Sequence, residues 1–150
     1  MVNSFIQLFD RDLEYLEAEV KTYKKESDLW LLPKGINNTG GNLCLHVVGN
    51  LQHYIGHILG NSGYVRNEEA EFSDKNVMVT SLVKEIETTR KAVIMTLNDL
   101  TEEQLASNYP LELFGDPMST SFFLIHLHGH LNYHIGQINY HRRLVQIYRC

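Results

Sequence analysis

The sequence predicts an all-α protein, a four-helix bundle that forms a single domain over residues 1–150. Four stretches carry apolar residues at helical spacing, and no stretch alternates with a period of two for long enough to be a strand. A chain of 150 residues with 43% hydrophobic residues also buries a substantial core without disulfides. The connections 61–75 and 107–119 are long for helix–helix turns, so helices adjacent in sequence need not be antiparallel neighbours.

The first two predicted helices cover the first 59 residues. The first spans about 4–23, with Ser4 and Gln7 as a candidate capping box at its start. The second spans about 42–59 and is entered through the turn-rich segment 37–41. Both have a continuous apolar line on one face, which predicts that they pack side by side on a shared core.

The other predicted helices lie in the second half of the chain. The third spans about 76–98, and residues 101–104 form a capping box that predicts a further short helical turn. The fourth spans about 120–148 and is the longest. Its last turns carry basic residues that complement the negative end of a helix, namely Arg142, Arg143 and Arg149.

Composition excludes several classes of protein. The net charge of −5 gives no electrostatic reason to bind nucleic acid. The first residues have no basic region before an apolar core, so neither a signal peptide nor a membrane span is expected. The two cysteines form no disulfide framework, and the sequence predicts a cytoplasmic protein in which Cys44 is buried and inert and Cys150 lies at a frayed end.

Histidine is distributed very unevenly. All eight histidines lie in two windows, 46–57 and 126–141, which fall in the second and fourth predicted helices. Each residue of an α-helix turns the chain by about 100° around the helix axis. On the second predicted helix, four polar residues therefore fall within an arc of about 60° and form one stripe, namely His46, Asn50, His53 and His57.

The fourth predicted helix carries a matching stripe beside its apolar line. Five of its polar side chains fall within about 80° of one another, namely His126, His130, His134, Gln137 and His141. His128, at about 200° from His126, is expected at the surface. The two stripes can face each other inside a bundle.

The spacing of His130 and His134 predicts a metal site. An i, i+4 pair stacks two imidazoles on one face of a helix, and a third histidine from the facing helix completes a three-histidine site. Such a site leaves a coordination position open, which is the catalytic pattern. Neither histidine window contains Asp or Glu, which excludes a di-iron carboxylate centre. Taken singly, His53, His57, His126 and His141 are each better explained as ordinary core or boundary histidines.

Two segments resemble the DinB-like (damage-inducible, YfiT-type) superfamily. They are CLHVVGNLQHYIGHILGNSGYVRNEEAEF at 44–72 and HLNYHIGQINYHRRLV at 130–145. The HxxxH followed by x-Gly-Gln resembles the closing motif of that family, and GYVRN-x-x-AEF resembles an uncharacterised bacterial subfamily within it.

This resemblance implies a fold and a ligand set. The implied fold is a bundle with up-down-down-up connectivity, often a homodimer. The implied cofactor is a divalent metal ion, nickel or zinc, held by three histidines that correspond to His46, His130 and His134. His53 is the competing ligand from the second helix. Asn50 and Gln137 are either supports that orient the ligands or structural hydrogen-bonding residues.

The resemblance also implies a function. Similar proteins include transferases that use low-molecular-weight thiols such as bacillithiol, and mycothiol-dependent isomerases, so we expect a metal-dependent S-transferase in detoxification or stress response, acting on a small molecule. The alternatives are a non-enzymatic metal-binding bundle, a structural dimer whose histidines titrate without metal, and a metal-dependent hydrolase.

Other polar residues near these motifs have two possible roles each. Arg66 and Glu71 either form an ion pair that fixes the loop, which we favour, or line the mouth of the site. Tyr133 and Tyr140 are expected to be packing or dimer-surface aromatics. Arg142 and Arg143 either hold an anionic substrate or, as the default, form a solvated helix end.

Overall fold

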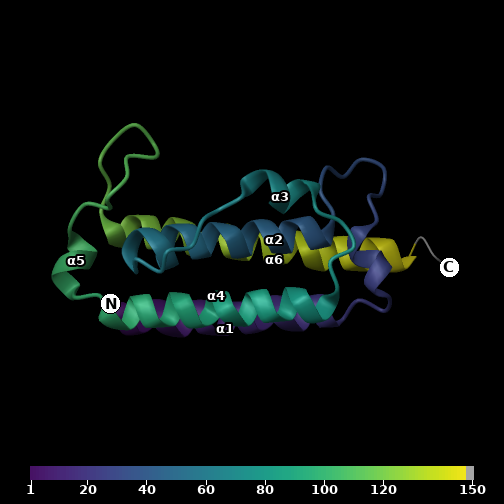
Figure 1. Ribbon diagram of the computed structural model, residues 1–150, viewed down its shortest axis with the longest axis horizontal. Helices are drawn as coiled ribbons and strands as arrows, with labels where there is room; N and C mark the ends of the chain where they lie inside the picture. The colour runs from purple at the N-terminus through teal and green to yellow at the C-terminus, as the bar shows by residue number, and fades with distance from the viewer. Residues whose placement is uncertain (148–150) are drawn as a thin grey trace.

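The computed structural model describes residues 1–147, and every regular element in that range is helical (Figure 1). No strand occurs in this part of the chain, where Asn108 and Ser119 form an isolated bridge. The prediction of an all-α protein is therefore confirmed. Tyr148, Arg149 and Cys150, to which the sequence assigned a helix end, a C-terminal charge and a frayed cysteine, lie outside the described residues.

Four long helical stretches form the body of the molecule, and shorter helices lie in the connections between them. In order along the chain, the elements are α1 (Val2–Lys21), the 3₁₀-helix η1 (Glu26–Trp30), α2 (Gly40–Leu51), the π-helix η2 (Gln52–Leu59), α3 (Glu68–Ser73), α4 (Val79–Asp99), α5 (Glu102–Ala106) and α6 (Thr120–Ile147). The sequence had assigned the residues of η1 and α3 to connections. None of the helices in residues 1–147 is long and apolar enough to cross a lipid bilayer.

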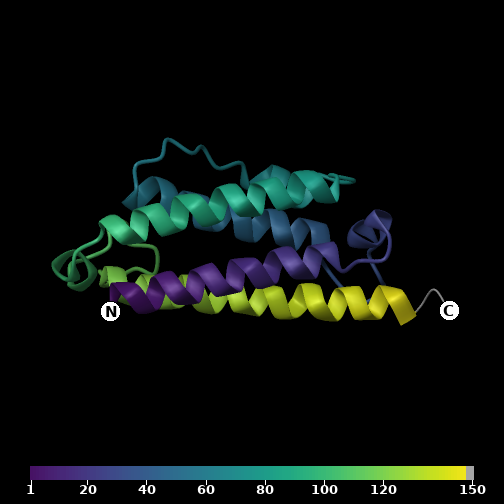
Figure 2. The ribbon, with the colours of Figure 1, turned by 90° about the horizontal axis from the view of Figure 1, so that it is seen from below.

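The long helices lie side by side along one axis (Figures 1 and 2). α1 packs against both α4 and α6, and α2 packs against α6, α3 and α4. Between them lies one buried cluster, to which α1 contributes Phe9 and Leu13, α2 contributes Val47, and α6 contributes Leu127 and Leu131. Cys44 belongs to this cluster, and burial raises the pKa of its thiol to about 12. That thiol is not a nucleophile near neutral pH.

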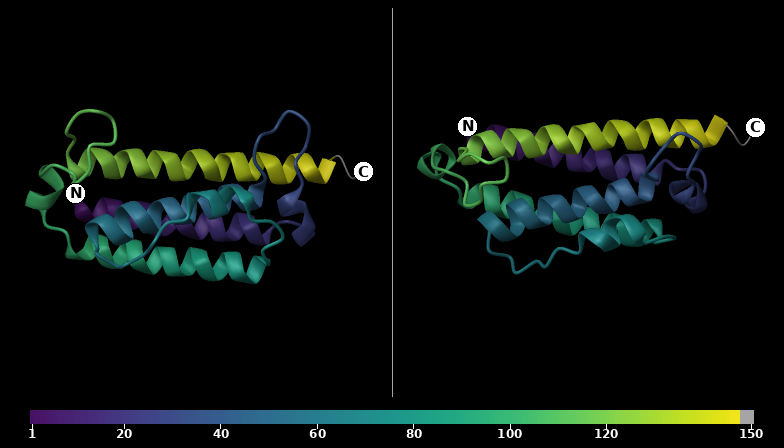
Figure 3. Two further views of the ribbon diagram at one scale, coloured as in Figure 1. Left: turned by 45° about the horizontal axis from the view of Figure 1, so that its top comes forward. Right: turned by 90° about the horizontal axis from the view of Figure 1, so that it is seen from above.

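The connections place two segments close to the helices that carry the histidines. The chain between η2 and α4 returns along the bundle and places α3 beside α2 (Figures 1 and 3). The loops that precede α2 and α6 project at opposite ends of the bundle (Figure 3). The loop before α2 therefore lies near the end of α6.

Of the two predicted capping boxes, one forms in the structure and the other does not. Thr101 and Gln104 form the predicted capping box, each bonding the backbone of the other, at the start of α5. Ser4 does not cap α1, because that helix begins two residues earlier with Met1 as its N-cap. Instead, the amino group of Met1 donates to Glu102 at 2.7 Å, which fixes the start of α1.

The first of the two histidine-bearing helices changes its geometry halfway. Residues 52–59 form a π-helix, in which the N–H of Gly60 donates to the carbonyl of Ile55, five residues earlier. A π-helix holds more residues per turn than an α-helix, so the angle of about 100° per residue does not apply beyond Leu51. The stripe predicted to run from His46 to His57 is therefore broken at the start of η2.

Candidate metal centre

Three histidines from two helices converge between α2 and α6. The Nε2 atom of His130 lies 3.2 Å from Nε2 of His46 and 3.0 Å from Nε2 of His134. Each residue offers one ligand atom, and these atoms all lie within 4.8 Å of one another. Tetrahedral coordination with bonds of about 2.0–2.1 Å separates neighbouring ligand atoms by about 3.3–3.4 Å. The three side chains are thus positioned for a single divalent ion.

Hydrogen bonds on the far side of two rings determine which nitrogen is free. Nδ1 of His46 lies 3.0 Å from a carboxylate oxygen of Glu71, and Nδ1 of His134 lies 2.7 Å from Oε1 of Gln137. Both partners accept hydrogen bonds, so each Nδ1 carries the proton and each Nε2 keeps its lone pair. This is the arrangement in which a second residue orients a metal-ligating histidine.

The pKa values also favour neutral imidazoles. Burial, and then the nearby His134 and His46, lower the pKa of His130 to about 4. The pKa of His134 is also lowered, mainly by burial. A histidine must be neutral to bind a metal ion, so these two rings are ready for coordination near neutral pH without losing a proton.

Glu71, on α3, connects the loop to the triad. Its side chain is 6% exposed and accepts two hydrogen bonds from Arg66, at 2.7 and 2.8 Å. Burial opposes ionisation of this carboxyl, but the hydrogen bonds from Arg66 and His46 outweigh it, so the pKa of Glu71 lies below its usual range. The Arg66–Glu71 ion pair predicted for the loop therefore exists, and it also contacts His46.

A glycine on α2 gives Glu71 room to reach His46. A Cβ added to Gly49 would lie 2.1 Å from Oε1 of Glu71. A residue with a Cβ at this position would displace the Glu71 carboxylate. The absence of a side chain at Gly49 therefore leaves the space that Glu71 occupies beside α2.

The remaining polar residues of the second-helix stripe do not join the triad. The ring of His53 packs on Tyr54 with 4.8 Å between centroids and lies 6.0 Å from His57. Among residues 1–147, the buried Nδ1 atoms of both histidines and Oδ1 of Asn50 have no hydrogen-bond partner. The Oδ1 atom of Asn50 thus supports no triad ring, whereas Gln137 contacts one directly.

On α6, two histidines that lie outside the triad contact other parts of the fold. His126 is exposed, and its ring lies 4.9 Å from that of Phe114. His141 is 2% exposed, and its nitrogens lie 2.8 Å from the hydroxyl of Tyr23 and 2.8 Å from the carbonyl of Leu31. His141 therefore serves as a packing residue.

His128 corrects one expectation from the sequence. Its side chain is 21% exposed instead of lying free at the surface, and its Nε2 is 2.6 Å from the buried carboxylate of Asp12 on α1. The helical wheel placed this residue opposite the triad stripe, but it did not show that α1 packs against that face of α6. His128 ties those two helices together.

The aromatic and basic side chains along α6 lie mostly at the surface. Tyr133 and Tyr140 are 64% and 73% exposed. Arg143 lies over the ring of Tyr140, with 5.5 Å from its guanidinium carbon to the ring centroid. Arg142 is half-buried and pairs with Glu19 on α1, so it is not the solvated helix end expected by default.

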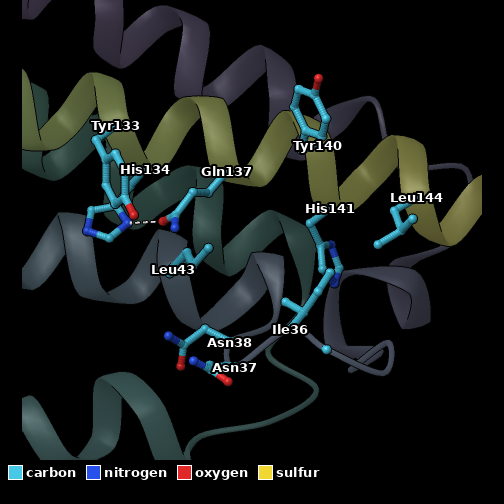
Figure 4. Close-up of a pocket in the computed structure, with 11 residues that line it drawn as sticks. Ile36, Asn37, Asn38, Leu43, Tyr133, His134, Gln137, Tyr140, His141 and Leu144 are labelled. Carbon is cyan, nitrogen blue, oxygen red and sulfur yellow. Dashed lines mark hydrogen bonds between the residues drawn. The ribbon is translucent and has the colours of Figure 1, made fainter.

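A cleft adjoins the triad at His134 (Figure 4). It has a volume of about 570 Å³ and lies between the segment 35–38 and α6 from Tyr133 to Leu144. Gln137, which holds the ring of His134, also lines it. A molecule in this cleft would therefore lie against a candidate ligand and its supporting residue.

Comparison with known proteins identifies the family. A family model described as the DinB superfamily matches residues 8–138. The chain belongs to the DinB superfamily. No curated protein is significantly similar to it.

Several solved structures are similar to the protein over nearly the whole chain. A DinB-like protein from Bacillus cereus has 18% identity and a TM-score of 0.75, and the match covers 96% of this chain and 92% of that one. A DinB-like protein from Bacillus subtilis has 17% identity and a TM-score of 0.69, with 95% and 92% covered. A conserved protein from Enterococcus faecalis has 16% identity and a TM-score of 0.72, with 97% and 96% covered. At these identities the likeness shows the fold alone.

Proposed function

We propose that this DinB protein holds one Ni²⁺ or Zn²⁺ ion on His46, His130 and His134 and transfers a low-molecular-weight thiol to a small electrophile. The observation that carries the proposal is the convergence of three Nε2 atoms, two of them with their lone pairs fixed by Glu71 and Gln137. Because all three donors are neutral imidazoles, the site favours an anionic fourth ligand such as a thiolate.

When bound, the metal would supply Lewis acidity, which lowers the pKa of a thiol or of water at the open position. The chain supplies orientation and charge. Glu71 and Gln137 hold the His46 and His134 rings in place, and Arg66 balances the charge of Glu71. The site therefore has no net negative charge that would repel a thiolate.

A transferase is favoured over a hydrolase by the state of the nearest carboxylate. Hydrolases with one metal ion commonly use a carboxylate as general base beside the attacking water. Glu71 contacts the triad, but one of its oxygens accepts from Arg66 and the other accepts from Arg66 and His46. It is not free to take a proton from water.

An assay of thiol transfer tests the proposal. Tag-free protein loaded with Zn²⁺ or Ni²⁺ is mixed with bacillithiol, mycothiol, glutathione or cysteine and with 1-chloro-2,4-dinitrobenzene. The thiol sulfur forms the new C–S bond, chloride leaves, and the thiol proton passes to solvent. We expect turnover with at least one thiol, lost on chelation, restored by metal and absent in His134→Ala. Bound metal with no turnover for any thiol would instead favour a non-enzymatic metal protein.

We also propose three features beyond the metal site and the reaction. They are the up-down-down-up order of the helices, a homodimer and a cytoplasmic location. Sedimentation equilibrium of the purified protein tests the homodimer, for which we expect twice the mass of one chain.

A further inference from the structure

A second pair of histidines lies on η2, outside the triad. The ring centroids of His53 and His57 are 6.0 Å apart, and the angle between the two ring planes is 33°. Both side chains are half-buried. The two rings therefore lie side by side along one face of η2.

Each of these rings has one buried nitrogen and one accessible nitrogen. The Nδ1 atoms of His53 and His57 are buried and have no hydrogen-bond partner among residues 1–147. Neither Nε2 atom has a partner in that part of the chain, and neither is among the buried polar atoms that lack one. The exposed part of each ring is therefore its Nε2 edge.

The burial of Nδ1 determines the tautomer of each ring. A neutral imidazole carries one N–H, and a buried N–H without an acceptor is rarer in proteins than a buried acceptor without a donor. The proton of His53 and of His57 is therefore on the accessible Nε2. In the triad, by contrast, Glu71 and Gln137 accept the Nδ1 protons, which leaves the Nε2 atoms free for a metal ion. The pair on η2 consists of donors, not of metal ligands.

Arg66 brings positive charge close to this pair. Its guanidinium carbon lies 5.8 Å from the ring centroid of Tyr54, and the ring of His53 packs edge-on against the same tyrosine at 4.8 Å. Burial is the main reason why the pKa of His53 is lowered, and Arg66 lowers this pKa further, by more than Glu71 raises it. His53 is therefore neutral near neutral pH, and the net field of the Arg66–Glu71 pair at its ring favours an anion.

We propose that His53 and His57 donate two Nε2–H hydrogen bonds to one oxyanion, a carboxylate or a phosphate of a small molecule. Oxygens of such groups accept from N–H donors at about 2.9 Å, so two neighbouring oxygens can bridge rings that lie side by side at this separation. The site requires no metal ion and is independent of the proposed function. It provides a place for an acidic ligand outside the three-histidine centre.

NMR spectra of the histidine rings test the tautomers on which the proposal depends. Long-range nitrogen–proton spectra of Zn²⁺-loaded protein near neutral pH distinguish Nδ1–H from Nε2–H. We expect Nε2–H in both His53 and His57, and Nδ1–H in either ring would overturn the proposal. The signals come from these two rings whether or not the triad takes up zinc, so a failure of this site is distinguished from a failure of the proposed function.

Titration with inorganic phosphate and with acetate tests binding on the same signals. We expect saturable shifts of both Nε2 resonances with at least one of the two anions, and the tighter of the two identifies phosphate or carboxylate as the ligand group. Sodium chloride at matched ionic strength is the control and should leave the resonances in place. No saturable shift with either oxyanion, or an equal shift with chloride, would overturn the proposal.

Substitutions of His57 separate donation from packing. His57→Phe removes the donor together with a buried nitrogen that has no partner, so the fold should tolerate it, and anion affinity should fall at least about fivefold. His57→Gln places an amide N–H near the position of Nε2 and should retain most of the affinity. His126→Phe, at an exposed position on α6, is the matched control and should bind as wild type does. Wild-type affinity in His57→Phe, followed on the signal of His53, would overturn the proposal.

Discussion

Glu71 presents a charged oxygen to His46, and Arg66 prevents that charge from being an isolated buried anion. Glu71→Gln keeps the size of the side chain but removes the charge that accepts from His46 and pairs with Arg66. We expect the affinity for Zn²⁺ or Ni²⁺ to fall about 10- to 100-fold, as is typical when the support of a metal-ligating histidine is lost. Competition with a chromogenic chelator measures this affinity.

Glu68 provides the control for that substitution. It is 69% exposed and lies 3.8 Å from the same Arg66 guanidinium. Glu68→Gln makes the same change of charge on the same arginine but touches no histidine, so metal affinity should match that of wild type. If Glu71→Gln also matches wild type, the role of Glu71 in orienting His46 is contradicted.

His141 gives the fold a dependence on pH. Its pKa is lowered, mainly because it is buried, from an ordinary value of 6.5. Between its folded pKa and 6.5, the unfolded chain binds a proton that the folded chain does not, so stability falls as the pH is lowered through that window and is fully present above it.

Thermal unfolding without metal, at pH 7.5 and at pH 5.5, measures this contribution. From pH 7.5 to pH 5.5, the melting temperature of wild type should fall further than that of His141→Gln, because the variant lacks the titrating imidazole. His130 and His134 titrate in both proteins and cancel in the comparison. An identical loss in the two proteins would show that His141 is not the group responsible.

Between elements, Gly49 on α2 leaves room for the Glu71 carboxylate of α3. Alanine in a helix interior is normally favoured over glycine by about 1 kcal/mol. In Gly49→Ala, however, the new Cβ would lie 2.1 Å from Oε1 of Glu71, which Arg66 holds in place. We expect Gly49→Ala to lower both the free energy of unfolding and metal affinity.

Gly129 on α6 offers a matched comparison, because a Cβ added there would meet nothing within 4 Å. Gly129→Ala should raise the free energy of unfolding by about 0.5–1 kcal/mol. Urea unfolding measures both variants. Equal stabilisation by both substitutions would mean that the approach of Glu71 to α2 is not close.

Helical periodicity predicted the long helices well, since each presents a continuous apolar face to one core. The same periodicity overextended the histidine stripe on the second helix, because apolar spacing does not distinguish an α-helix from the π-helix of η2. It also gave no sign of α3, whose Glu71 pairs with the nearby Arg66 and fits against Gly49 on α2, a contact that local spacing does not describe.

In the whole molecule, the spacing of residues along the chain predicted only the part of the candidate site that lies on α6. An i, i+4 pair on one helix is a local geometry, so His130 and His134 could be placed together from the sequence. The i, i+3 relation of His134 and Gln137 is equally local. The choice of His46 over His53 depended on family resemblance, since the two rings lie on the same face of an ideal helix and only the tertiary structure separates them.

The proposed metal site consists of His46, His130 and His134, which together would hold one divalent ion. Elemental analysis of tag-free protein tests this site on wild type, His46→Ala, His134→Ala and His53→Ala. We expect one nickel or zinc ion per chain in wild type and in His53→Ala, with most of the metal lost in the other two variants. Wild type without metal, or His134→Ala with a full complement, would show that the three histidines do not form this site.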